Sequence, residues 1–341
     1  MRPIEGVYEK AKGLKIPLAV HFDLTYRCHH RCVHCYIPQA WRQGKGPGPE
    51  LNTREILDVL DQLAATGAFF LTFSGGEVFL RPDLMTILEC ARRLDFSVTL
   101  FSSGTVGLEE EKIQALAAVG IEALIFSIYS VSASVHDRIT GRPGSWDSMW
   151  RTIRKCRDRG VPVGFNVTAF ICNYGEIKAI KDFIQREALF CRVGTCITPR
   201  WDGQSHPLGL ALGGEELSHL EAVMREEQEA MAPELHSPPR AGKINNQCGV
   251  GLNSIYLSPQ GEVWPCIEVP IKCGHLKKER FEDIWHNSPA LNRVRQIVDQ
   301  ELTSEERLCH HFWANQKTVE LAEFQRELAK NFLPQSALRK H

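Results

Sequence analysis

The stretch Cys28-His29-His30-Arg31-Cys32-Val33-His34-Cys35 directly follows an apolar run, residues 17–22, which predicts a first β-strand. Its three cysteines have the spacing Cys-x3-Cys-x2-Cys. Thiolates are soft ligands, and iron–sulfur clusters are held by cysteines that lie close together in sequence. Three cysteines would leave one iron of a four-iron cluster without a protein ligand and open to a small molecule. The alternatives are a zinc knuckle that uses His29, His30 or His34, and three unrelated buried thiols.

Six predicted strands alternate with helices along the first part of the chain, and this alternation predicts a parallel sheet. The strands are expected at residues 17–22, 69–73, 97–101, 122–129, 162–170 and 189–198. The helices between them are expected at about 52–66, after Pro82, and at 109–119, 145–159 and 173–185. Asn173 with Glu176 has the form of a capping box. Residues 38–49 are rich in Gly, Pro, Gln and Arg and predict an exposed loop.

A second motif, Ser74-Gly75-Gly76-Glu77, directly follows the second predicted strand, and Ser127 ends the fourth. The carboxyl ends of parallel strands meet at one edge of a sheet. We therefore expect the cysteine loop, the glycine motif and Ser127 to open onto one rim. A zinc knuckle would not require this arrangement.

The two motifs together resemble the signature of the radical S-adenosylmethionine (SAM) enzymes, with His34 at the usual aromatic position beside the last cysteine. This resemblance implies a partial (β/α)6 TIM-like barrel in an α/β fold. In that family SAM chelates the open iron, and an electron from the cluster cleaves SAM to methionine and a 5′-deoxyadenosyl radical that abstracts a substrate hydrogen. The implied cluster ligands are Cys28, Cys32 and Cys35.

The same resemblance implies which residues surround SAM. Gly75, Gly76 and Glu77 correspond to the segment that holds the amino group of SAM, and His34 belongs to the same binding site. Ser127 is expected at the ribose. Arg142 could pair with the SAM carboxylate, or be an exposed loop arginine, and Asn166 could face the adenosine, or be an ordinary buried amide.

Four further cysteines lie in the last third of the chain: Cys248, Cys266, Cys273 and Cys309. A hairpin is predicted in this region at residues 253–258 and 262–266, with Gly261 in its turn and Cys266 at the end of its second strand. The region resembles the SPASM/twitch extension of peptide-modifying radical SAM enzymes, which holds auxiliary iron–sulfur clusters in an α+β domain. Because the later cysteines of the full SPASM pattern are absent, we expect a single auxiliary 4Fe–4S cluster, with Cys273 its least certain ligand. The alternative is a hairpin with incidental thiols.

The 341 residues carry a net charge of −1 and no basic tract, which disfavours sequence-nonspecific nucleic-acid binding. The N-terminal stretch lacks the apolar core of a signal peptide, and no run approaches the ~20 apolar residues that span a bilayer. A cytoplasmic protein is expected. Its twelve cysteines then indicate metal sites and buried thiols rather than disulfides.

The expected organisation has five parts. They are an N-terminal extension (1–17), the radical SAM barrel (18–213), a helical linker (214–246), the auxiliary-cluster domain (247–313) and a C-terminal helix and tail (314–341).

The favoured function is hydrogen abstraction from a ribosomally made peptide, leading to a cross-link, an epimerised centre or a related modification. The expected electron donor is a flavodoxin or ferredoxin. Only about seventeen residues precede the first strand, which weakens the prediction of a peptide substrate unless recognition resides in a separate protein. The alternatives are a small-molecule substrate, as in haem-type or aminoglycoside pathways, and a non-catalytic metal-binding protein.

Overall fold

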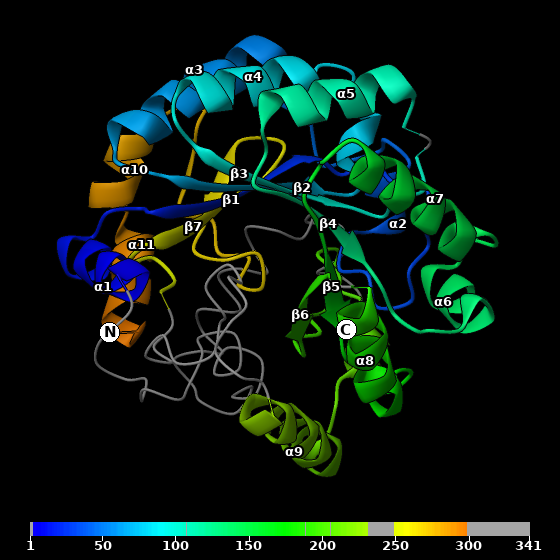
Figure 1. Cartoon of the computed structure of the whole chain (residues 1–341). Coiled ribbons are helices and arrows are strands. Elements are labelled where there is room, and N and C mark those ends of the chain that lie inside the picture. Colours follow the sequence, from blue (N-terminus) through cyan, green and yellow to red (C-terminus); the bar gives the residue numbers. More distant parts are fainter. Residues whose placement is uncertain (1–2, 107, 188, 205, 231–248, 299–341) are drawn as a thin grey trace.

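The computed structural model describes residues 3–106, 108–187, 189–204, 206–230 and 249–298. In this part of the chain nine strands form one sheet in the order β6-β5-β4-β3-β2-β1-β7-β8-β9 (Figure 1). The strands are β1 (Ala19–Thr25), β2 (Phe70–Gly75), β3 (Ser97–Ser102), β4 (Ala123–Ser127), β5 (Val163–Thr168), β6 (Phe190–Gly194), β7 (Ser254–Leu257), β8 (Glu262–Trp264) and β9 (Gly274–His275). The neighbours from β6 to β1 are all parallel, as the alternation predicted; β7 also pairs with β1 in parallel, which was not predicted, and β7 to β9 are antiparallel.

Helices follow the outer side of the curved sheet (Figure 1). The described helices are α1 (Pro3–Leu14), α2 (Gln39–Arg42), α3 (Thr53–Ala65), α4 (Leu84–Arg93), α5 (Glu110–Val119), α6 (Ala133–Thr140), α7 (Ser145–Asp158), α8 (Ile177–Arg186), α9 (Gly214–Ala230), α10 (Phe281–Asn287) and α11 (Pro289–Gln296). The fold is thus an α/β partial barrel. The longer barrel helices bury apolar stripes, as in α3, where the stripe includes Ile56, Val59, Leu60 and Leu63.

The predicted hairpin is confirmed as β7 and β8, and it joins the barrel rather than standing apart. β7 lies parallel to β1, with Val20 opposite Ile255 and Phe22 opposite Leu257. All four of these side chains belong to one buried cluster that also contains the inner residues of α3 and α10. The C-terminal segment therefore forms one wall of the same core.

Local signals at the ends of helices were correct in some places and wrong in others. Asn52 forms a complete capping box with Glu55 at the start of α3, and Gly120 ends α5 in the left-handed conformation. The capping box predicted at Asn173 is wrong, because its side chain instead bonds the backbone of Phe170, Tyr129 and Thr168. Tertiary hydrogen bonds thus outcompete the local cap.

The predicted exposed loop at residues 38–49 contains the short helix α2, and its last residue, Arg42, is only 5% exposed. The prediction is therefore wrong at Arg42, whose side chain turns inward. Helices α1 and α6 were not predicted. The helix expected near 314–331 lies outside the described residues.

No helix in the described part of the chain is both long enough and apolar enough to cross a membrane.

Candidate active site

The carboxyl ends of the parallel strands surround a cavity of about 350 Å³. Most of the residues singled out in the sequence line it: Cys28, Cys32, His34, Cys35, Gly75, Gly76, Ser127 and Asn166. The expected single rim is therefore confirmed for these residues. Glu77 and Arg142 are not among the residues that line this cavity.

The glycine motif is seated against the backbone that leads into the cysteine loop. The N–H of Gly76 donates to the Thr25 carbonyl at 2.7 Å, and the N–H of Glu77 donates to the Arg27 carbonyl at 2.8 Å. Gly75 has a φ of +129°, and a Cβ atom added to it would lie 2.1 Å from the Thr25 carbonyl oxygen. A Cβ atom added to Gly76 would lie 2.3 Å from the Arg27 carbonyl oxygen. Only glycine fits at either position, so the close approach of the two loops explains the motif.

The Glu77 carboxylate is fully buried and is held by the end of β3. One of its oxygens accepts hydrogen bonds from the Ser102 hydroxyl at 2.9 Å and the Phe79 N–H at 3.3 Å. The other accepts from the N–H of Ser103 at 2.9 Å and from the hydroxyl of the same residue. The structure thus places this carboxylate behind the wall of the cavity, where it joins β2 to β3.

The three cysteines of the loop are half-buried thiols. Burial raises the pKa of Cys28 to about 12, with a further contribution from the Glu77 carboxylate. Burial also raises the pKa of Cys32 well above its usual value, and that of Cys35 in the same direction. Because these pKa values are raised, binding of a cluster must release the protons of the three thiols.

The three thiols line one cavity together with residues from the ends of several strands. The cysteines of a 4Fe–4S cluster bind different irons, so three thiols around one cavity match the donor set of a cluster with one open iron.

His34 provides an independent sign of a ligand. Its ring packs against Tyr129 and Phe170, with centroid distances of 4.8 and 4.7 Å. Burial lowers the pKa of His34 to about 4, so the ring is neutral. Its Nδ1 is buried without a hydrogen-bond partner. A buried ring nitrogen without a partner, in the lining of the cavity, fits a hydrogen-bonding molecule such as SAM.

Two arginines differ from the sequence expectation. Arg142 follows α6, is half-exposed, and does not line the cavity. Arg42 does line it, is buried, and donates from Nη1 to the His30 carbonyl at 2.9 Å. Sequence reasoning missed Arg42 because its loop resembles exposed chain in composition.

A polar network on β1 was also missed. His21 lines the cavity, and its Nε2 lies 3.1 Å from the carboxylate of Asp23, which is fully buried. Tyr256 on β7 donates to the same carboxylate at 2.8 Å. The available signal was the pair of polar residues at alternate positions of an otherwise apolar strand, since such positions face the same side of a sheet.

Other residues extend the lining away from the cysteine loop. Asn166 and Thr168 come from β5 and Arg192 from β6, while Ile267 and Glu268 come from the segment after β8. A molecule in this cavity therefore contacts both the barrel and the C-terminal segment.

The auxiliary cysteines are described only in part, because Cys248 and Cys309 lie outside the described residues. Cys266 is half-buried just after β8. Cys273 is buried in the main core, where its thiol donates to the Ile271 carbonyl at 3.5 Å. Burial raises the pKa of Cys273 to about 12. These contacts are those of a packing residue.

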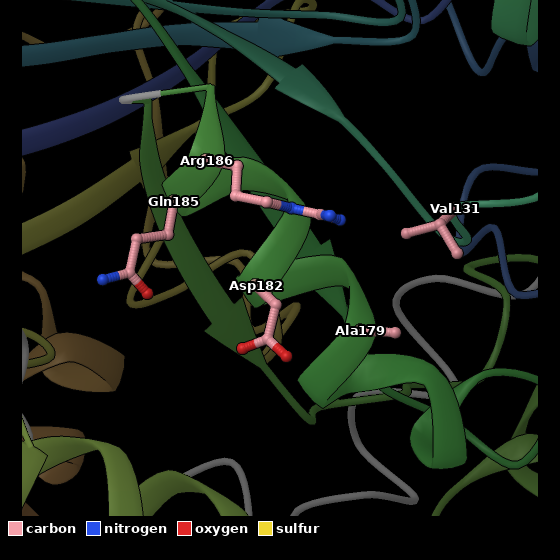
Figure 2. A pocket seen from close by; sticks show the side chains of 5 residues that line it. All are labelled: Val131, Ala179, Asp182, Gln185 and Arg186. Carbon is pink, nitrogen blue, oxygen red and sulfur yellow. The ribbon is translucent and has the colours of Figure 1, made fainter.

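A second hollow, of about 650 Å³, lies between α8 and Val131 (Figure 2). Its other lining residues, Ala179, Asp182, Gln185 and Arg186, all come from α8. Asp182 is paired with Lys178 in the same helix. None of the cysteines or motif residues lines this hollow, so it is not the candidate active site.

Two family models match the chain. Residues 22–184 match the Radical SAM superfamily, and residues 248–311 match SPASM, an iron–sulfur cluster-binding domain. These ranges contain the two cysteine groups.

The fold is similar to that of several solved structures. SuiB of Streptococcus suis bound to S-adenosylmethionine is 16% identical, over 83% of this chain and 68% of that one, with a TM-score of 0.63. SuiB bound to the precursor peptide SuiA is 14% identical over 85% and 69%, with a TM-score of 0.66. Native anSMEcpe with bound AdoMet is 12% identical over 83% and 84%, with a TM-score of 0.64. At such identities the likeness establishes the shared fold.

Proposed function

The chain is a radical SAM enzyme with a C-terminal SPASM domain, and we propose that its substrate is a peptide. The radical SAM domain implies a 4Fe–4S cluster and SAM, and the SPASM domain implies auxiliary iron–sulfur binding. When bound, the cluster and SAM supply a 5′-deoxyadenosyl radical for hydrogen abstraction. Membership of this enzyme family excludes the non-catalytic alternative.

We assign the cluster to Cys28, Cys32 and Cys35. In this proposal the backbone of Gly75 and Gly76 binds the amino group of SAM, and the unpartnered Nδ1 of His34 hydrogen-bonds the nucleoside. Ser127 and Asn166 contact the ribose and adenosine, since they are direct neighbours in the register of β4 and β5 and both line the cavity. The site-facing role expected for Arg142 is not part of this assignment.

The lining of the cavity is the observation that carries the peptide proposal. Thr168, Arg192 and Glu268 offer donors and acceptors on walls contributed by both the barrel and the C-terminal segment. Such groups can bind the repeated N–H and C=O groups of an extended peptide. Neighbouring folds support the same class, because SuiB is described with its precursor peptide SuiA and anSMEcpe with a Cp18Cys peptide.

The finer elements of the proposal concern its partners. A flavodoxin or ferredoxin supplies the electron, and a separate protein presents the peptide. The modification is a cross-link, an epimerised centre or a related change that begins with hydrogen abstraction.

The experiment uses the full chain, reconstituted anaerobically with iron and sulfide, with SAM, dithionite and each short peptide that sequencing of the neighbouring genes identifies as a candidate substrate. Formation of 5′-deoxyadenosine should increase when the peptide is added, and the mass of the peptide should change. The variant with Cys28, Cys32 and Cys35 all replaced by Ala should form no 5′-deoxyadenosine while it keeps some iron.

Two results would count against the proposal. Unchanged SAM cleavage in the triple variant would remove the cluster assignment. SAM cleavage that neither the peptide nor a scrambled peptide stimulates, but that a small metabolite does, would replace the peptide with a small-molecule substrate.

A further inference from the structure

Arg42 lies at the base of the cysteine loop and is bound to it twice. Its backbone carbonyl accepts the N–H of Cys28 at 3.0 Å, and its Nη1 donates to the carbonyl of His30 at 2.9 Å. The side chain is 5% exposed and lines the cavity beside all three cysteines. Arg42 is therefore a buried cation that is attached to the cluster loop.

The charge of this guanidinium has no counter-ion in the described part of the chain. Arg42 takes part in none of the ion pairs found there. Its Nε is buried and has no hydrogen-bond partner. A buried, unpaired charge is strongly unfavourable, so an arginine in this state calls for a nearby anion.

The three cysteine side chains line the same cavity as Arg42, and cysteines that ligate a cluster do so as thiolates. They are therefore the groups that supply this anion. Arg200 does not line the cavity. Glu77 is not a competing partner, because its carboxylate is bound by Ser102, Ser103 and Phe79.

We infer that Arg42 is the buried counter-charge of the cluster held by Cys28, Cys32 and Cys35, and that it raises the reduction potential of that cluster. The inference rests on the cluster assignment proposed above. Reduction adds one negative charge to the cluster, and a fixed cation beside it stabilises the reduced form more than the oxidised form. Because Arg42 is buried, this attraction is less screened than that of an exposed cation.

The potential is measured by an EPR-monitored redox titration of the full chain, reconstituted anaerobically. The signal followed is the one that changes when SAM is added, so that an auxiliary cluster does not enter the measurement. Arg42→Gln should lower the equilibrium constant of one-electron reduction at least tenfold, about 59 mV. Arg42→Lys keeps a cation at the site and should stay within threefold of the parent.

Arg200→Gln is the matched control. Arg200 also touches the loop, through a hydrogen bond from Nε to the Cys35 carbonyl at 3.4 Å, but it is half-exposed and also donates to Gln204. Water screens its charge, and this variant should stay within threefold of the parent.

The outcomes separate a role of charge from a structural role. If Arg42→Gln loses its iron while Arg42→Lys retains it at the parent potential, the requirement for a cation is supported. Loss of iron in both Arg42 variants would overturn the inference, as would an unchanged potential in iron-loaded Arg42→Gln or equal shifts in Arg42→Gln and Arg200→Gln.

The titration contains no peptide, so its result does not depend on the substrate class. A SAM-sensitive signal that persists in the triple cysteine variant would instead overturn the ligand assignment.

Discussion

The Glu77 carboxylate is fully buried and accepts four hydrogen bonds, and replacing Glu77 with Gln removes its charge. Each of its oxygens accepts one backbone N–H, from Phe79 on one side and from Ser103 on the other. An amide has only one oxygen. In either orientation of the introduced amide, one backbone N–H therefore faces an NH₂ group and loses its acceptor, whereas the serine hydroxyls can rotate to accept.

The size of the effect follows from these contacts. A buried donor without an acceptor costs about 1–3 kcal/mol, and hydrogen bonds that lose their charge assistance weaken roughly by half. We therefore expect the free energy of unfolding to fall by about 3 kcal/mol. In a domain of about 200 residues this corresponds to a decrease of roughly 6–12 °C in Tm.

The assay is thermal unfolding of the chain without SAM, followed by circular dichroism under anaerobic conditions. Glu55→Gln is the matched control, because Gln also forms the capping box that Glu55 makes with Asn52, and its Tm should change little. Equal Tm values for the two variants, combined with weaker SAM binding by Glu77→Gln alone, would refute the reasoning. That result would mean that the Glu77 carboxylate contributes to SAM binding and not to the stability of the contact between the ends of β2 and β3.

Three further changes probe other parts of the structure. Gly76→Ala should abolish SAM binding and reduce iron content, because the new Cβ would lie 2.3 Å from the backbone oxygen of Arg27. Unchanged SAM affinity in a titration would contradict the close approach of Gly76 to this backbone. Burial lowers the pKa of His136 to about 4, so the neutral ring that accepts the Tyr129 N–H must be protonated as the pH falls. This group is neutral in both states above pH 6.5. Protonation of His136 should therefore lower the free energy of unfolding progressively between about pH 6.5 and 4, by about 3 kcal/mol in total. In urea denaturation at several pH values, His136→Asn should reduce this dependence of the free energy of unfolding on pH. In a background that lacks the first cluster, Cys266→Ala should lose iron and lower the Tm of the C-terminal segment, and full retention of iron would show that Cys266 is not a ligand. Cys273→Ala should keep its iron if packing in the core is the only role of Cys273.

The sequence predicted the fold well wherever the signal was local and repeated. Alternating apolar runs and amphipathic helices were enough to infer the parallel sheet, because burial of both faces imposes that pattern on every strand. Capping was correct at Asn52, where only neighbouring residues compete, and wrong at Asn173, where the carbonyl of Tyr129 lies close in space but distant in sequence.

In the candidate site, too, local features could be predicted from the sequence, whereas contacts between distant segments could not. Cysteine spacing and the paired glycines could be interpreted from the sequence alone, since ligands of one cluster and the turn that meets them occupy a few consecutive residues. The reason for the glycines became visible only in the structure, where Gly75 and Gly76 abut the backbone of Thr25 and Arg27.

By itself, the sequence determined the alternation of six parallel strands with helices, the cluster-loop motif and the class of chemistry, because each depends on residues within one turn or one strand of each other. Tertiary structure alone decided that β7 completes the barrel beside β1, that the Glu77 carboxylate turns toward β3, and that Arg42 is buried while Arg142 is not. These outcomes depend on which distant segments exclude water from a side chain. The composition of a short stretch of sequence does not contain that information, because an arginine is the same residue type whether the fold buries it or exposes it.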